Sequence, residues 1–263
     1  MDIHCARSDA LPAYAELHCV SNFSFLRGAS HPAELVARAH ALGYTALALT
    51  DECSLAGVVR AHLAARETNV KLVIGAEFTL AEGTSLVLLA PDRAAYGNLS
   101  QLITAGRRAA TKGTYRVTRN EVERGTAGCL ALWLPPAPFE ESRAHAESEW
   151  LGAVFADRAW IAVELLHSGR DAEQLAALRR LSARSGLPLV AAGDVHMHKR
   201  ARRPLQDVLT AIRRGETMAQ AIPALHPNGE RHLRRRQALA ALYPPELLVA
   251  TVEIAARCTF SLD

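Results

Sequence analysis

The chain has 263 residues, of which 49% are hydrophobic and 22% charged, and its formal net charge is +3 at pH 7. This composition excludes a disordered or fibrous protein and provides enough residues for one large domain or two small ones. A net charge of this size identifies no class of binding partner, since only a strong imbalance indicates nucleic acid or a membrane surface.

The predicted strands, in chain order, are seven short apolar segments. They span residues 14–19, 44–50, 71–78, 85–90, 129–134, 160–166 and 187–192. Strands that are apolar throughout are buried on both faces, which favours a parallel sheet covered by helices. Seven such strands predict an α/β fold, either a β/α barrel or a doubly wound sheet.

Helical spacing between these strands predicts helices in residues 31–43, 54–67 and 171–186. Ser30 is a candidate N-cap of the first helix, and Gly43 and Gly186 are stop signals. The chain is predicted to be helical from Arg202 onward. Because no repeat or low-complexity linker marks a second domain, we expect one domain over residues 1–263. It would have a barrel at about 12–200 and a helical, basic extension at about 201–263.

The basic residues are concentrated in one stretch near the C-terminal end of the sequence. Residues 199–236 hold ten Lys or Arg residues and three acidic ones. This stretch is either a DNA-binding surface or a solvated face, and the lack of interleaved aromatic residues favours the solvated face. Arg202 and Arg203 are candidates for contact with another part of a larger protein.

The cysteines indicate a reducing compartment. Cys5, Cys19, Cys53, Cys129 and Cys258 are scattered, odd in number and form no Cys-x-x-Cys pair, which argues against disulfides and a zinc ribbon. The N-terminal segment lacks a basic region followed by an apolar run, and no segment has the roughly 18 apolar residues of a membrane helix. We therefore expect a cytoplasmic protein with no membrane partner.

Polar residues follow several predicted strands at their carboxyl ends. They are His18, Asp51, Glu52, Glu77, His167, Asp194 and His196. In a β/α barrel these ends share one rim, where mixed His and carboxylate ligands suit Zn²⁺, Mn²⁺ or Fe and metal-activated water hydrolyses phosphoesters. The alternatives are structural: Asp51 caps the next helix, and a single strand-end His is more often hydrogen-bonded than a ligand. Four other imidazoles, of His145, His198, His226 and His232, are expected at the surface.

Several of these segments carry a family resemblance. They are AELHCVSNFSFLRGAS, LTDECSLAGVVRAH, IGAEF, LVLLAPDRAAYGNLSQLIT, LVAAGDVHMH and the closing VEIAARCTFSLD. Together they resemble the PHP (polymerase and histidinol phosphatase) domain of C-family bacterial DNA polymerases. The segments LHCVSNFSFLRGAS and TDECSLAGVVRAH resemble the error-prone, translesion branch of these polymerases rather than the main replicative alpha subunit.

The resemblance implies a fold and a rim of known type. The fold is a distorted, seven-stranded, TIM-barrel-like β/α barrel with a C-terminal helical extension, and in active relatives a trinuclear metal cluster at the rim hydrolyses phosphoesters. Four ligand positions match here, His18, Glu77, Asp194 and His196, with Asp51 and His167 as supporting residues. Five positions depart from the pattern: Val20, Arg27, Glu52, Ser85 and Ser168.

These departures predict a degenerate metal site. Valine at position 20 has no lone pair, and Arg27 brings a fixed positive charge to the place of a cation. Glu52 is expected to pair with Arg27 and fill the cavity. We expect no catalytic residue and at most one weakly bound divalent ion, Zn²⁺, Mn²⁺ or Mg²⁺.

The function that the resemblance implies is that of the N-terminal PHP module of an error-prone DNA polymerase, acting in damage-induced mutagenesis and translesion synthesis. The module itself would be structural, without proofreading, and these residues do not include the polymerase site. Implied partners are the rest of the polymerase chain, DNA through the full-length enzyme, mutagenesis accessory proteins and the sliding clamp. The alternative is an active metal-dependent phosphoesterase or 3′–5′ exonuclease with an unusual ligand set.

Overall fold

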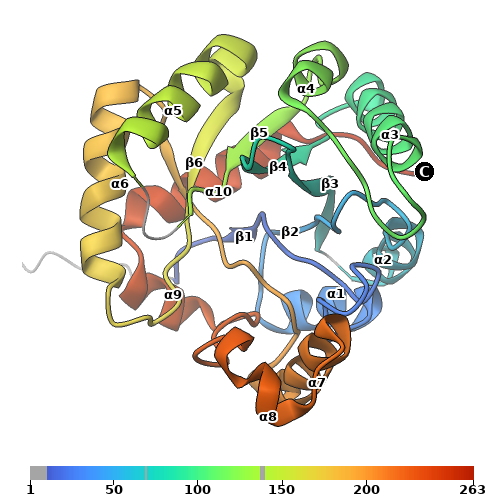
Figure 1. Cartoon of the computed structure of the whole chain (residues 1–263). Helices are drawn as coiled ribbons and strands as arrows, with labels where there is room; N and C mark the ends of the chain where they lie inside the picture. Colours follow the sequence, from blue (N-terminus) through green and yellow to red (C-terminus); the bar gives the residue numbers. More distant parts are fainter. Residues whose placement is uncertain (1–10, 69, 137–139) are drawn as a thin grey trace, which may run out of the picture.

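The computed structural model describes residues 11–68, 70–136 and 140–263. Within these residues, seven strands form one curled sheet in the order β1 to β7, as Figure 1 shows from the rim formed by most of their carboxyl ends. The strands are β1 (Ala15–Glu16), β2 (Ala46–Leu49), β3 (Lys71–Thr79), β4 (Ser85–Leu89), β5 (Leu130–Trp133), β6 (Ala159–Val163) and β7 (Leu189–Ala191). The seven predicted strands are confirmed, most of them over shorter spans.

Strand β4 corrects the expectation of a wholly parallel sheet. It runs antiparallel to both β3 and β5, while the other neighbouring pairs are parallel. The reason is the short link of residues 80–84 between β3 and β4, which includes Gly83 at a φ of 86°. A parallel crossover needs a dozen residues or more, whereas a tight turn returns the chain antiparallel.

Helices that connect the strands cover the outside of the sheet, as Figure 1 shows. They are α1 (Pro32–Ala41), α2 (Val58–Arg66), α3 (Arg93–Arg108), α4 (Arg119–Gly125), α5 (Glu141–Phe155) and α6 (Asp171–Ser185). The N-cap of α1 is His31, one residue after the predicted Ser30, and its backbone N donates to the Glu34 carboxylate at 2.9 Å. Helix α6 ends as predicted at Gly186, which has a left-handed φ of 76°.

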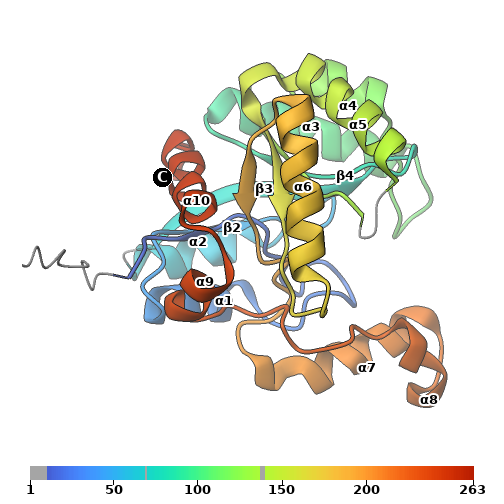
Figure 2. The ribbon, with the colours of Figure 1, turned by 90° about the vertical axis from the view of Figure 1, so that its left-hand side faces the viewer.

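The chain after β7 forms four further helices, α7 (Arg203–Arg214), α8 (Met218–Ala221), α9 (Arg236–Leu242) and α10 (Pro245–Arg257). Short 3₁₀ turns lie before β6 at Ala156–Arg158, and after β7 at Arg200–Arg202 and Ile222–Ala224. Helix α10 packs against β1 and β7 and buries Leu248 and Ile254. Helices α7 and α8 lie away from the sheet, as Figure 2 shows. The predicted helical extension therefore has one part in the core and one part that projects. In the described part of the chain, no helix is long and apolar enough to cross a membrane.

Two apolar clusters fill the molecule. The larger lies between the sheet and the covering helices, and the smaller combines alternate strand residues with α10. Val73, Trp160 and Val190 belong to the smaller cluster. Because successive strand side chains alternate in direction, residues four positions further along each chain segment point the same way. This alternation directs Glu77 of β3 and Glu164, which directly follows β6, to the rim above this cluster, whereas Asp194 stands three residues after the end of β7 at a left-handed φ of 42°.

Candidate functional site

His18 lies at the centre of a polar network on the rim. It follows β1, and its buried imidazole holds two carboxylates: Nδ1 is 2.7 Å from Glu164 Oε1, and Nε2 is 3.0 Å from Glu77 Oε2. Burial alone would lower the pKa of His18, but the hydrogen bonds with Glu164 and Glu77 outweigh it and raise the pKa to about 9. The imidazole is therefore a cation between two anions at neutral pH.

Arg27 supplies the second cation of the network. Its guanidinium binds Glu77 in a bidentate manner, with Nη1–Oε1 at 2.9 Å and Nη2–Oε2 at 3.0 Å, and Nη1 also donates to Glu52 Oε2 at 2.9 Å. The predicted Arg27–Glu52 ion pair is thus confirmed. Burial opposes ionisation of Glu77, yet Arg27 and His18 hold the pKa of its carboxyl far below the usual range. Planar fork geometry makes this arginine–carboxylate contact strong and directional.

Asp194 and His196 form the other half of the network. His196 Nε2 is 2.9 Å from Asp194 Oδ1, and His196 Nδ1 is 2.6 Å from Gln206 Nε2 on α7. The guanidinium of Arg231 pairs with the Asp194 carboxylate, and His18 Nδ1 lies 4.0 Å from Asp194 Oδ1. Burial and the positive charge of Arg27 lower the pKa of His196 to about 3, so its ring is neutral.

These contacts define the rim network, which consists of His18, Arg27, Glu52, Glu77, Glu164, Asp194, His196 and Arg231. It brings together all four residues that match the family's ligand positions. Its members come from segments far apart in the sequence, and each carboxylate in it has at least one cationic neighbour.

Asp51 does not cap a helix but holds the loop that leads to Arg27. Its carboxylate accepts three hydrogen bonds: from Ser21 N at 2.7 Å, Ser21 Oγ at 2.8 Å and Ser24 Oγ at 2.7 Å. These bonds fix the loop that carries Arg27. The same loop requires Gly28, because a Cβ there would lie 2.0 Å from the Ser21 carbonyl oxygen. Asp51 therefore positions Arg27 without touching it.

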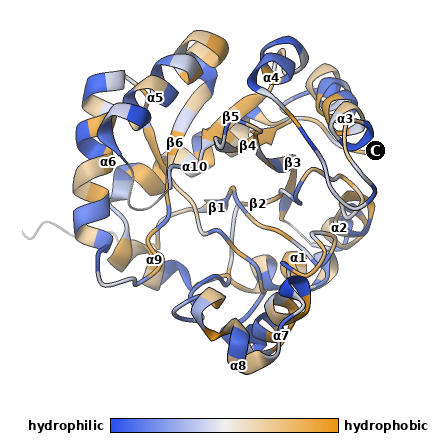
Figure 3. Ribbon diagram, in the orientation of Figure 1, coloured by the Kyte–Doolittle hydropathy of each residue, from blue (hydrophilic) through white to orange (hydrophobic). Residues whose placement is uncertain are grey.

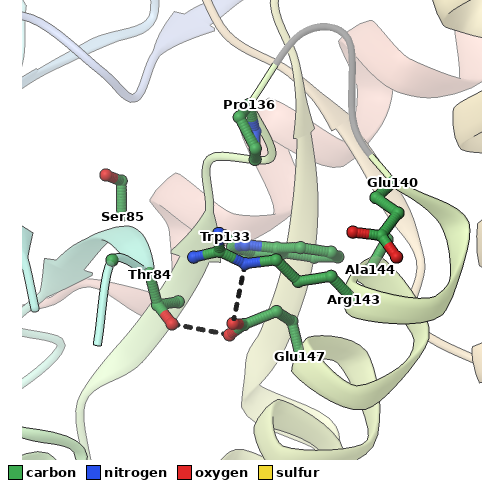
Figure 4. Close-up of a pocket in the computed structure, with 9 residues that line it drawn as sticks. Thr84, Ser85, Trp133, Pro136, Glu140, Arg143, Ala144 and Glu147 are labelled. Atoms are coloured by element: carbon green, nitrogen blue, oxygen red, sulfur yellow. Dashed lines mark hydrogen bonds and ion pairs between the residues drawn. The ribbon is translucent and has the colours of Figure 1, made fainter.

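Three of the five departing positions, Val20, Ser85 and Ser168, lie outside the rim network. The Val20 side chain is buried, and its backbone N donates to Val195 O at 2.9 Å, which joins the segment after β1 to the segment after β7. Ser85 lies beside Thr84 and Trp133 in a separate hollow near the start of α5, shown in Figure 4. The Ser85 hydroxyl lies 3.1 Å from that of Thr79, and neither Val20 nor Ser85 takes part in the hydrogen bonds of the rim network.

His167 and Ser168 are exposed in the loop before α6. Their backbone N atoms donate to Asp171 Oδ2 at 2.8 Å and Oδ1 at 3.0 Å. The loop therefore holds the start of α6, and the structure does not bring His167 to the network that it was expected to support.

The sequence analysis missed Glu164, Arg231 and Gln206. Glu164 could have been found from strand periodicity. It stands four residues after Trp160, just as Glu77 stands four residues after Val73, and both Trp160 and Val73 belong to the smaller apolar cluster. Arg231 and Gln206 follow the last strand and had no local signal.

His226 corrects the prediction of a surface imidazole. It is half-buried, its Nδ1 accepts from Arg231 Nε at 3.0 Å, and its ring centre is 5.4 Å from that of His196. His145, His198 and His232 are also half-buried rather than fully exposed.

Comparison with protein-family models identifies the fold's family. The model of the PHP domain matches residues 16–159, which is more than half of the chain. The chain belongs to the PHP domain family. Two solved structures share the fold: an amidohydrolase from Chromobacterium violaceum (TM-score 0.55) and a protein from Bifidobacterium adolescentis described as a metal-dependent phosphoesterase (TM-score 0.53). Each is 18% identical; they cover 70% and 71% of this chain, and 88% and 89% of their own. The predicted distorted barrel is confirmed.

Curated relatives extend the match to nearly the whole PHP chain. A protein of Dechloromonas aromatica named error-prone DNA polymerase is 58% identical over 259 residues, which are 97% of this chain and 25% of the relative. One of the same name from Methylococcus capsulatus is 58% identical over 252 residues, 95% of this chain and 24% of the relative. The chain spans about a quarter of the length of these relatives.

The arrangement of the rim does not fit the metal cluster that the family implies. A ligand must turn a free lone pair to the ion, whereas Glu77 turns both oxygens to Arg27, and Asp194 pairs with Arg231 and His196. A guanidinium cannot lose its proton to make room for a cation. Among residues 11–68, 70–136 and 140–263, no three His, Cys, Asp or Glu side chains are placed to hold a metal ion.

Proposed function

We propose that this chain is the PHP module of an error-prone DNA polymerase and that its own role is structural. The high identity over nearly its whole length to error-prone DNA polymerases of about four times its size supports the biological context. The single observation that carries the structural role is the bidentate Arg27–Glu77 contact, extended to Glu52.

Charge balance supports the loss of metal chemistry in this module. The cations Arg27, Arg231 and protonated His18 stand among the acidic side chains of the rim, where active relatives hold metal ions. Fixed cations neutralise buried carboxylates, as metal ions would, but they cannot lower the pKa of a water molecule for attack on phosphorus. The rim would then stabilise the barrel and carry out no hydrolysis.

The wider role follows from the polymerase context. The full-length protein would catalyse nucleotidyl transfer in DNA repair and translesion replication in the cytoplasm, after DNA damage. Its partners would be DNA, mutagenesis accessory proteins and the sliding clamp, and the module's direct partner would be the rest of the polymerase chain.

Direct DNA binding by the basic stretch receives less support. Four of its arginines pair with acidic side chains of the same chain: Arg200 with Glu230, Arg202 with Glu34, Arg203 with Asp207 and Arg214 with Glu216. Such pairs reduce the positive potential that a phosphate backbone would meet.

A metal-dependent phosphoesterase is the second candidate, because five donor side chains share the rim: those of His18, Glu77, Glu164, Asp194 and His196. In this case a metal ion would have to displace Arg27.

The two candidates are separated by metal content and hydrolysis. We expect the purified chain to hold less than about one tenth of an equivalent of Zn, Mn or Fe by elemental analysis, and to release no nucleotide from a 3′-labelled primer in Mn²⁺. Two or three tightly bound ions, or primer degradation that His196→Ala abolishes, would establish the phosphoesterase instead. Primer extension past an abasic template site by the full-length polypeptide, and not by this chain alone, tests the polymerase context.

A further inference from the structure

The projecting helices α7 and α8 carry an apolar face that is open to solvent. Leu205, Val208 and Ile212 stand at positions i, i+3 and i+7 of α7, which places them on one side of the helix. Met218 of α8 and Ile222 just after it continue the exposed set, and Ile212 and Ile222 are 58% and 65% exposed. Figure 3 shows apolar residues interspersed with polar ones along both helices. We call these five side chains the hairpin face.

The first half of α7 is anchored to the barrel. On the other side of α7, Gln206 is buried and contacts His196 of the rim network, and Arg203 Nη2 donates to the His226 carbonyl at 2.9 Å. Arg202, just before α7, pairs with Glu34 of α1. The apolar side chains therefore stand on a helix that the barrel holds in place, and an exposed apolar patch on such an element is typical of an interaction site.

The charges around the hairpin face favour a protein partner over nucleic acid. Arg203 pairs with Asp207 at 3.4 Å near the start of α7, and Arg214 pairs with Glu216 at 2.7 Å near its end. Arg213 adds one exposed cation beside Ile212, but a surface with an apolar centre and mostly paired charges at its ends resembles the core and rim of a protein–protein interface. A surface for a phosphate backbone would instead present unpaired cations.

The lengths of the relatives suggest an occupant for this face. The hairpin lies outside residues 16–159, to which the PHP family model is matched, but the match to the polymerase relatives covers 95–97% of the chain. At least three quarters of each relative therefore lies outside the region that this chain matches. We propose that the hairpin face docks onto the polymerase region of the same polypeptide, a proposal that rests on the proposed function.

Thiol labelling tests this docking directly. Ile212→Cys is introduced both in this chain and in the full-length polypeptide, and maleimide modification is read by mass spectrometry of the peptide that contains residue 212. Leu63→Cys on α2 is the matched control, because Leu63 is 56% exposed in the described structure. We expect modification at 212 to be at least tenfold slower in the full-length polypeptide than in this chain, with no such difference at 63.

Other outcomes overturn the proposal. Equal rates at 212 in the two proteins would show that the polymerase region leaves the face open. Protection in the short chain that grows with its concentration would assign the face to a second copy, and protection that appears only with primer–template would assign it to DNA. The proposed function is judged separately: a full-length wild-type protein that extends no primer refutes it, whatever the labelling shows.

Discussion

The rim network and the hairpin face adjoin each other, but they satisfy their side chains in opposite ways. In the rim network, the chain supplies the counter-charge for its own buried carboxylates, as Arg27 does for Glu77 and Arg231 for Asp194. On the hairpin face, Ile212 and its neighbours remain in water. The rim is thus complete within this chain, whereas the hairpin retains apolar surface whose burial would release further free energy. Substitutions in the rim network should therefore act independently of the rest of the polymerase, whereas substitutions on the hairpin face should depend on it.

Removal of Arg27 should have the largest effect on this chain alone. Arg27→Met keeps much of the side-chain volume but leaves Glu77 buried without its main cation, and breaking a buried ion pair costs about 3–5 kcal/mol. We expect this loss in the free energy of unfolding, measured by urea denaturation in EDTA so that no metal ion replaces the guanidinium. Arg213→Ala, at an exposed position of α7, is the control and should change stability by less than about 0.5 kcal/mol. A loss of under about 1 kcal/mol for Arg27→Met would mean that the rim is not held together by its charges.

Loss of Asp51 should destabilise the chain to a smaller extent. Asp51→Ala leaves three donors of the Ser21–Ser24 loop without their acceptor, and an unsatisfied buried polar group costs about 1–3 kcal/mol. Because water can reach part of an opened loop, we expect about 2–3 kcal/mol in the same denaturation experiment. Asp51→Asn retains one acceptor oxygen and should lose about half as much. Equal stability of Asp51→Ala and the wild type would show that the loop holds Arg27 without this carboxylate.

The sequence predicts the strands and helices better than the direction in which neighbouring strands run. Seven strands were identifiable because each is a continuous apolar run, and three helices because their start and stop signals are local. The direction of β4 was missed although the 80–84 link is too short for a parallel crossover. Turn length therefore carried information about strand direction that apolar runs alone do not contain.

The rim was predictable where it depends on strand ends. The positions at strand ends predicted that His18, Glu77, Asp194 and His196 would share one edge with other polar residues, the family resemblance singled out these four, and the structure brings them into one network. Arg231 could not be foreseen in the same way. It lies in a segment after the last strand whose return to the rim depends on tertiary packing, and no local pattern encodes that path.

The smallest expected effect on this chain is that of Ile212→Arg, and it distinguishes the two regions most sharply. Ile212 is mostly exposed, so a charged replacement should change the free energy of unfolding by less than about 0.5 kcal/mol. In the full-length polypeptide the same substitution would place a charge at a buried contact, which should lower the thermal midpoint by several degrees. Arg27→Met should destabilise both proteins alike, since its partners are all in this chain. If Ile212→Arg were neutral in the full-length protein as well, the hairpin face would be as independent of the polymerase as the rim is, and the contrast between the two regions would disappear.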